Sequence, residues 1–131
     1  MKLDQITPVI LTSNEEPNIS RTLSALSWAE TIIMLDSFST DRTKSICREF
    51  RNVRFHQRKF TTHSEQWNAA INLATTPWVL SLDADYQLSS NLLHEMKELT
   101  PSLSVKGYAI PFIFAVNGSH LRAHLLPPRI A

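Results

Sequence analysis

An apolar run that passes directly into two aspartates decides the fold prediction: Trp78-Val79-Leu80-Ser81-Leu82-Asp83-Ala84-Asp85. A short apolar run of this kind is typical of a strand buried in a parallel sheet. In an extended chain, Asp83 and Asp85 point to the same side. Their carboxylates suit a shared hard cation such as Mg²⁺ or Mn²⁺ that bridges to a diphosphate. A polar turn is the plainer interpretation of two aspartates at this spacing.

Strand-like and helix-like stretches alternate along the chain around this run. We expect strands at residues 6–11, 31–35, 53–55, 78–82 and 108–116, and helices at residues 13–26, 39–50, 62–74 and 91–99. Ser13 and Glu16 have capping-box spacing, which marks a helix start. Thr62 and Glu65 repeat that spacing. Helical periodicity assigns these residues to the core: Ile19, Leu23, Leu26, Trp67, Ala70, Ile71 and Ala74. The alternation predicts a three-layer α/β/α sandwich with a mostly parallel sheet.

Size and composition exclude several classes of protein. The chain has 131 residues, which suits one domain, and 43% of them are hydrophobic, which suits a globular core. A net charge of +1 argues against nucleic acid as a partner. A single cysteine, Cys47, excludes an internal disulfide and a cysteine-rich zinc site. The two glycines, Gly107 and Gly118, come too late for a dinucleotide fingerprint or a P-loop.

Polar residues follow three of the predicted strands, at the edge of the sheet where ligands of open α/β folds bind. They are Thr12 to Glu15 after the first strand, Asp36 after the second, and the pair of aspartates after the fourth. Asp36 has two interpretations, as a cap for the next helix or as an acceptor for the N–H groups of a base or ribose. Gln66 and Asn68 lie two apart on a helix, so they are on different faces and at least one of them can face the cleft. His120 and His124 have no third ligand close by in the sequence to complete a zinc site.

Four segments, in this order and at this spacing, resemble those of the family 2 inverting glycosyltransferases. The segments are Val9–Ile19, Ile33–Thr43, Gln66–Ala70 and Trp78–Asp85. The form Asp36-Ser37-Phe38-Ser39-Thr40-Asp41 is most similar to the lipopolysaccharide core glucosyltransferase subgroup. The resemblance covers roughly residues 6–116 and implies the Rossmann-like nucleotide-diphospho-sugar transferase fold, of GT-A type. Residues 1–131 are expected to be its N-terminal, donor-binding part.

The resemblance also implies roles for particular residues. Thr12, Asn14 and Glu15 would line the nucleotide end of the site, and Asp36 would bind the base, usually uracil. Gln66 and Asn68 would lie near the ribose and diphosphate. Asp83 would contact the ribose or the metal, and Asp85 would bind the divalent metal, Mn²⁺ or Mg²⁺, that holds the donor diphosphate. The chain departs from the family at Ser13, where many members have an aromatic residue. It departs also at Ser37 and Phe38, where many have an acid and a glycine, and at Tyr86, which replaces a frequent acid.

The function implied is transfer of a sugar, with inversion, from a nucleotide-diphospho-sugar such as a UDP-sugar to a saccharide or lipid-linked acceptor. Such an enzyme would serve lipopolysaccharide or surface-polysaccharide synthesis in the cytoplasm, at the inner face of the bacterial membrane. Family members carry the acceptor site and catalytic base beyond about residue 120, so we expect the acceptor part to be absent and nominate no base. The apolar end, Leu125–Ala131, suggests truncation, and an exposed apolar face would favour a homo-oligomer.

Two alternatives remain open from the sequence. The chain could be a non-catalytic domain that binds a nucleotide or a partner chain. It could also be a haloacid-dehalogenase-type phosphatase, with Asp83 as nucleophile and Asp85 as acid. That motif usually opens its domain and carries Thr or Val where Gln87 stands here.

Overall fold

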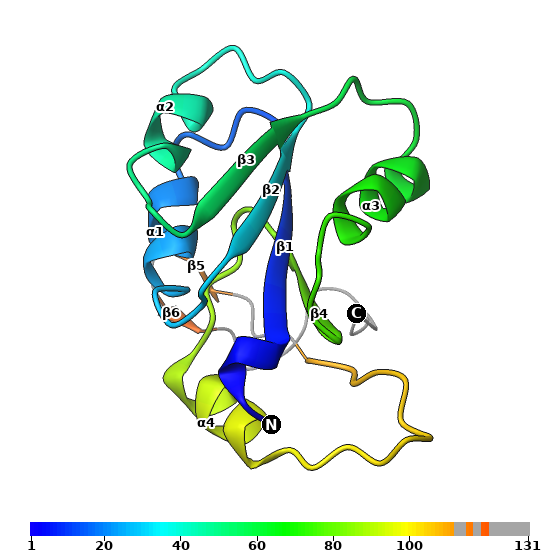
Figure 1. Ribbon diagram of the computed structural model, residues 1–131. Coiled ribbons are helices and arrows are strands. Elements are labelled where there is room, and N and C mark those ends of the chain that lie inside the picture. Colours follow the sequence, from blue (N-terminus) through cyan, green and yellow to red (C-terminus); the bar gives the residue numbers. More distant parts are fainter. Residues whose placement is uncertain (112–114, 117–118, 121–131) are drawn as a thin grey trace. The chain divides into compact units, whose positions relative to one another are not determined.

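A sheet of four parallel strands organises the chain up to Thr100 (Figure 1). The computed structural model describes residues 1–111, 115–116 and 119–120. The chain divides into two units, Met1–Thr100 and Pro101–Ala131, which are described separately.

The strands of the first unit run in the order β3-β2-β1-β4. Their bounds are Ile6–Thr12 for β1, Ile32–Asp36 for β2, Val53–Gln57 for β3 and Trp78–Asp83 for β4. Each neighbouring pair is parallel, and the register pairs Thr12 with Asp36 and Leu11 with Asp83. Because the strands are parallel and end together, the residues that follow them meet at one edge of the sheet.

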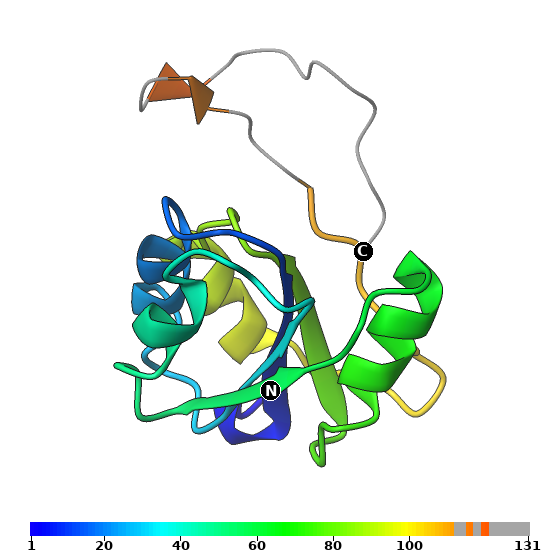
Figure 2. The same cartoon turned by 90° about the horizontal axis from the view of Figure 1, so that it is seen from above.

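Helices cover both faces of this sheet. A short 3₁₀ helix, Leu3–Gln5, precedes β1, and the α-helices are α1 (Ile19–Ser24), α2 (Thr43–Cys47), α3 (His63–Ile71) and α4 (Ser90–Glu98). Helices α1, α2 and α4 lie on one side of the sheet and α3 lies on the other (Figure 2). The structure therefore confirms the predicted three-layer α/β/α sandwich.

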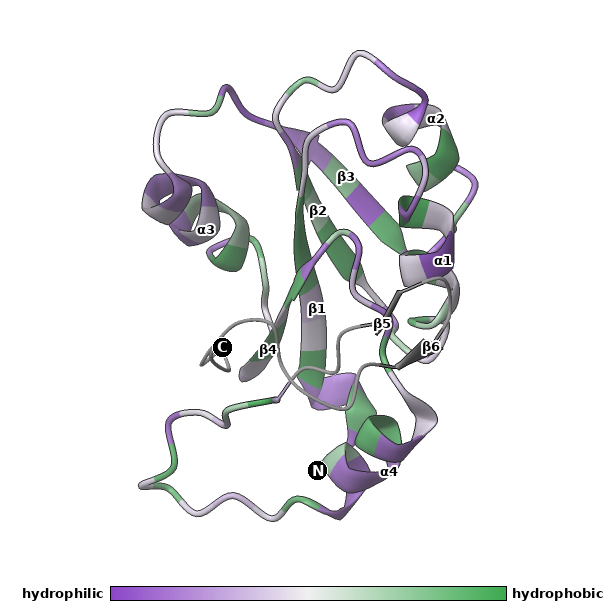
Figure 3. Ribbon diagram, turned by 180° about the vertical axis from the view of Figure 1, so that it is seen from behind, coloured by the Kyte–Doolittle hydropathy of each residue, from purple (hydrophilic) through white to green (hydrophobic). Residues whose placement is uncertain are grey.

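The core lies mainly on β1 and β2, which sit between the other two strands. All five residues of β2 are buried, including Asp36, and its apolar residues colour this part of the sheet hydrophobic in Figure 3. Val9, Ile33, Leu35 and Ala70 form a buried cluster beneath α3, against which Trp67 packs. Burying an aliphatic side chain of this size stabilises the fold by about 1.5–3 kcal/mol. Strand β3 alternates between half-buried and exposed residues, as its sequence pattern predicts.

Two details of the predicted helices are wrong. The spacing of Ser13 and Glu16 predicts a helix start, but α1 begins only at Ile19. Asn14 has a φ of 52°, which does not fit a helix, and residues 13–15 instead form part of a loop. The prediction that Ile71 is in the core is also wrong, because this last residue of α3 is 39% exposed. Ile19, Leu23 and Leu26 are buried as predicted.

The second unit contains a short antiparallel pair, β5 (Ala115–Val116) with β6 (Ser119–His120). The predicted strand at residues 108–116 is wrong for 108–111, which are irregular. Residues 112–114, 117–118 and His124 lie outside the described residues. Among the residues that the structure describes, no helix has the length and apolar character needed to span a membrane.

Candidate functional site

A cavity of about 360 Å³ opens at the edge of the sheet where the strands end. We call it the donor cavity, after the sugar donor that the sequence resemblance leads us to expect there. It is lined by Leu11, Thr12, Ser13, Glu15, Ser37, Phe60, His63, Gln66, Asp83, Ala84 and Asp85. Five of the predicted site residues are in this set: Thr12, Glu15, Gln66, Asp83 and Asp85. Three are not: Asn14, Asp36 and Asn68.

The two aspartates reach the donor cavity by a turn. Strand β4 ends at Asp83, and the amide N–H of Tyr86 donates to the Asp83 carbonyl at 3.1 Å, which closes a turn around Asp85. The sequence predicts that both carboxylates point the same way from an extended chain. In the structure a turn brings both of them to one cavity instead. The hydroxyl of Thr22, on α1, donates to the carbonyl of Ala84 at 2.7 Å. Because this bond is buried, it fixes the middle of the turn.

Asp36 lies outside the lining and is completely buried. Its carboxylate accepts hydrogen bonds from the hydroxyl of Thr12 at 2.9 Å, the amide N–H of Ser39 at 2.8 Å, the Gln57 side chain at 3.2 Å and the Ser39 hydroxyl. A buried carboxylate needs such donors, and this one joins the ends of β1, β2 and β3. The predicted contact of Asp36 with a base stays a prediction. In this structure Asp36 holds the strand ends together at the edge of the sheet.

Gln66 lies in the wall of the donor cavity, but its amide is engaged within the protein. The amide nitrogen donates to the Arg58 carbonyl and to the Ser37 hydroxyl, each at 3.3 Å, and the amide oxygen accepts from the Arg58 guanidinium at 3.0 Å. Only 1% of the residue is exposed. Gln66 therefore ties α3 to the segments that follow β2 and β3. Asn68 lies on an exposed face of the same helix, as expected for residues two apart.

Asn14 joins the loop after β1 to the loop after β2. Its side-chain oxygen accepts from the amide N–H groups of Thr40 at 2.8 Å and Asp41 at 3.3 Å. The next residue repeats the link in the other direction, since the Glu15 N–H donates to the Thr43 hydroxyl at 2.9 Å. These bonds explain why Asn14 tolerates a positive φ, which asparagine adopts more readily than most residues.

Asp41 holds the same pair of loops through its carboxylate. It accepts from the hydroxyl and the N–H of Thr43 and from the N–H of Glu16. The Thr43 hydroxyl bond is the largest influence on Asp41; it and the backbone N–H groups hold the pKa of Asp41 below its ordinary value of 3.8, against a smaller effect of desolvation. The carboxylate therefore supports the loop in its charged form.

Phe60 and His63 line the donor cavity, and the sequence patterns did not point to either of them. Phe60 lies in the connection between β3 and α3, and His63 is the first residue of α3. Neither belongs to a periodic apolar pattern or to a pair of charged residues. The available signal was an aromatic residue, Phe60, just before the capping box of Thr62 and Glu65. The cap fixes where the helix begins. The structure confirms that cap, since the Thr62 hydroxyl accepts from the Glu65 N–H at 3.2 Å.

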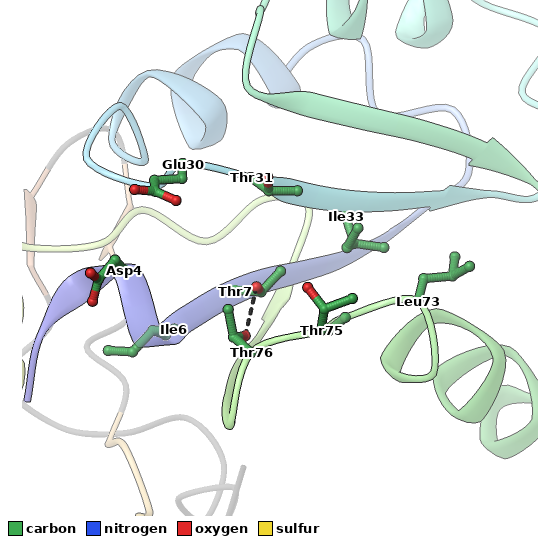
Figure 4. Close-up of a pocket in the computed structure, with 10 residues that line it drawn as sticks. Asp4, Ile6, Thr7, Glu30, Thr31, Ile33, Leu73, Thr75 and Thr76 are labelled. Carbon is green, nitrogen blue, oxygen red and sulfur yellow. Dashed lines mark hydrogen bonds between the residues drawn. The ribbon is translucent and has the colours of Figure 1, made fainter.

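A second, smaller cavity of about 110 Å³ lies at the opposite end of the strands (Figure 4). It is lined by residues that begin or precede strands, and the hydroxyls of Thr7 and Thr76 share a hydrogen bond of 2.7 Å there. Asp4 and Glu30 are its charged residues, and both are exposed. It contains none of the predicted site residues.

The described residues include no group of three or more His, Cys, Asp or Glu side chains placed to hold a metal ion. A two-carboxylate site is a different case. Mg²⁺ and similar ions are commonly held by one or two carboxylates together with substrate phosphates. Asp83 and Asp85 in one cavity fit that arrangement.

Comparison with known proteins now gives the family. The model of glycosyl transferase family 2 matches residues 7–118. The chain belongs to glycosyl transferase family 2. The matched region contains all the residues that line the donor cavity. Membership favours the transferase interpretation of Asp83 and Asp85 over the phosphatase alternative.

Curated glycosyltransferases are similar to this chain over most of its length. An uncharacterized glycosyltransferase of Rickettsia felis is 28% identical over 101 residues, which cover 76% of this chain and 35% of that protein. The lipopolysaccharide core biosynthesis glycosyltransferase LpsC of Rhizobium meliloti is 28% identical over 98 residues, which cover 72% of this chain and 35% of LpsC. The chain thus spans about a third of the length of these relatives.

Solved structures support the fold. The crystal structure of S. aureus TarS 1–349 superposes with a TM-score of 0.63 at 22% identity, covering 71% of this chain and 31% of that one. Its complex with UDP gives a TM-score of 0.61 at 24% identity, over the same shares of the two chains. The likeness confirms the expected GT-A type fold, of which this chain has the N-terminal region.

Proposed function

We propose that this chain is the donor-binding part of an inverting glycosyltransferase that uses a UDP-sugar. The observation that carries the proposal is the position of Asp83 and Asp85, which line one cavity with Thr12 and Glu15 at the edge where the parallel strands end. In a member of family 2, this is where a nucleotide-diphospho-sugar is expected to bind. A structural neighbour crystallised with UDP supports the choice of nucleotide.

The donor set suits a divalent cation, Mn²⁺ or Mg²⁺. Such a cation, when bound, takes up negative charge on the departing diphosphate. Asp83 and Asp85 would hold it together with phosphate oxygens, which supply the ligands that two carboxylates do not. Thr22 keeps the Asp83–Asp85 turn in place through the Ala84 carbonyl.

The other residues of the donor cavity would shape and orient the bound nucleotide. Thr12 lines the cavity and is held by Asp36, and Gln66 keeps Ser37 and Arg58 in fixed positions around it. Such preorganisation reduces the cost of ordering loops when the ligand binds.

The acceptor and the cellular role are further proposals. The similarity to LpsC supports a saccharide or lipid-linked acceptor in lipopolysaccharide or surface-polysaccharide synthesis. A lipid-linked acceptor would place the enzyme in the cytoplasm at the inner membrane face. The relatives are about three times as long as the matched region, so we assign the catalytic base and acceptor site to the part that they have in addition. Inverting transfer needs a base to take the proton of the acceptor hydroxyl. We expect this chain alone to bind donor and to transfer little sugar.

Calorimetric titration of UDP, with and without Mn²⁺, tests the proposal. The variants are Asp85→Ala and, as a matched control, Asp4→Ala, which removes an exposed carboxylate from the opposite end of the strands. We expect binding that depends on Mn²⁺, is lost in Asp85→Ala and is unchanged in Asp4→Ala. Equal binding by all three proteins, or no binding by folded wild-type protein, would refute the proposal.

A further inference from the structure

We infer that the exposed ring of Phe60 is the surface on which the nucleobase of the donor stacks, and this inference rests on the proposed function. Phe60 lines the donor cavity and is nevertheless 50% exposed. A large apolar ring is normally covered by other side chains. An uncovered ring in a ligand cavity offers a face to a flat ligand, and every nucleobase has such a face.

The sheet topology places Phe60 at the base end of a bound nucleotide. Phe60 follows β3, and Asp83 and Asp85 follow β4, which is at the other edge of the order β3-β2-β1-β4. Outer strands separated by three strand spacings are about 14 Å apart. A nucleoside diphosphate carries its diphosphate at one end and its base at the other. With the diphosphate held at Asp83 and Asp85, the base extends toward the β3 side of the cavity.

The ring is held in place by neighbours that continue into the core. Phe60 meets His63 edge to face, with ring centroids 6.5 Å apart and planes at 64°. His63 meets Trp67 in the same way, at 6.3 Å and 73°. Trp67 in turn packs against the buried cluster beneath α3. This series of edge-to-face contacts orients Phe60 without covering it.

Hydrogen bonds anchor the chain before and after Phe60. The N–H of Arg58 donates to the Asp36 carbonyl at 3.0 Å, and the Arg58 side chain bonds to Gln66 at 3.0 Å. The Thr61 hydroxyl bonds to the carboxylate of Glu65. The connection between β3 and α3 is therefore anchored on both sides of the ring, so little order would have to be gained on stacking.

The other described residues of the cavity wall have no aromatic ring on which a base could stack. Of the described residues that line the donor cavity, the aromatic ones are Phe60 and His63. Ser13 lines the cavity as well but has no ring. Phe38 is more exposed than Phe60, at 56%, but it is outside the lining. Phe38 therefore provides a matched control.

Comparing two ligands separates stacking from other roles of Phe60. UDP and inorganic pyrophosphate are titrated with Mn²⁺ into wild-type protein, Phe60→Ala, Phe60→Tyr and Phe38→Ala. Loss of base stacking in Phe60→Ala is expected to weaken UDP binding by about tenfold or more and to leave pyrophosphate binding unchanged. Phe60→Tyr keeps a ring and Phe38→Ala keeps the cavity, so both are expected to bind UDP as the wild type does.

Proton NMR of UDP, recorded with diamagnetic Mg²⁺ in place of paramagnetic Mn²⁺, gives a second readout that does not depend on affinity. The uracil ring protons are expected to shift upfield on binding to wild-type protein and to Phe60→Tyr, and to lose that shift with saturated Phe60→Ala. The inference is overturned if Phe60→Ala binds UDP as well as the wild type, or if it loses UDP and pyrophosphate equally. If wild-type protein binds UDP with Mn²⁺ while Phe60→Ala is unchanged, the inference fails and the proposed function stands. If folded wild-type protein binds neither ligand, both fail.

Discussion

The hydroxyl of Thr12 donates a 2.9 Å hydrogen bond to the carboxylate of Asp36, and the two residues are register partners at the ends of β1 and β2. Only Thr12 of this pair lines the donor cavity. The buried carboxylate therefore acts on the cavity through its neighbours. This arrangement links the stability of the sheet edge to the shape of the site.

Replacing Asp36 tests that link. Asp36→Ala leaves the buried hydroxyl of Thr12 and the half-buried donors of Ser39 and Gln57 without their acceptor. We expect the free energy of unfolding to fall by about 2–3 kcal/mol, together with weaker UDP binding. Urea denaturation measures the first effect, and the exposed Asp4→Ala is its control. A free energy of unfolding for Asp36→Ala equal to that of the wild type would contradict the organising role.

Thr22 is expected to matter for binding although it lies outside the cavity lining. Thr22→Val keeps the shape of the side chain and removes its hydrogen bond to the Ala84 carbonyl. We expect a loss of about 1 kcal/mol in unfolding free energy and roughly tenfold weaker binding of UDP with Mn²⁺, because the turn between Asp83 and Asp85 loosens. Thr22→Ser restores the hydroxyl and should recover the affinity. Wild-type affinity in Thr22→Val would show that the turn does not need this bond.

Phe38 has a φ of 57° and a side chain that is 56% exposed. A positive φ strains a residue with a β-carbon by about 1–2 kcal/mol. Glycine relieves that strain, but its greater freedom in the unfolded chain offsets part of the gain. We expect Phe38→Gly to raise the free energy of unfolding by about 0.5–1 kcal/mol. Phe38→Ala, which keeps the β-carbon, serves as the control in the same denaturation experiment. A less stable glycine variant would mean that the Phe38 ring makes contacts that outweigh the strain.

Acid is expected to weaken the link between the loops at Asp41. The pKa of Asp41 is lower in the folded protein than its ordinary value of 3.8, chiefly through the hydroxyl of Thr43. Its stabilising contribution is therefore fully present above that ordinary value and is lost as the pH falls through the lower, folded pKa. Denaturation midpoints of wild-type protein and Asp41→Asn, measured from neutral pH down to the acid range, should differ at neutral pH and converge in acid. A difference that is the same at every pH would contradict this role.

The strands could be predicted from the sequence because their apolar runs follow directly from burial in a parallel sheet. Residues such as Ile32 and Met34 are apolar whichever face they occupy, and the polar residue that ends each run marks the edge of the sheet. That rule also found Thr12, Asp83 and Asp85, which the structure brings to one cavity.

Contacts between distant segments could not be predicted in the same way. The capping-box spacing held at Thr62, where the cap is local, and failed at Ser13, where the loop bonds to residues about 25 positions further along the chain. Thr22 has no sequence feature that distinguishes it from an ordinary helix residue, since its partner is 62 residues away. Phe60 reaches the cavity from a connection without periodicity, so its exposure becomes visible only in three dimensions.

In the proposed site, Asp83 and Asp85 hold the donor diphosphate through a divalent cation. The most direct measurement is a crystal structure of this chain with UDP and Mn²⁺, in which anomalous scattering locates the metal. We expect a manganese peak between the carboxylates of Asp83 and Asp85 and the diphosphate, in the donor cavity. Bound UDP with its diphosphate away from both aspartates, or manganese at the opposite end of the strands beside Asp4 and Glu30, would contradict it.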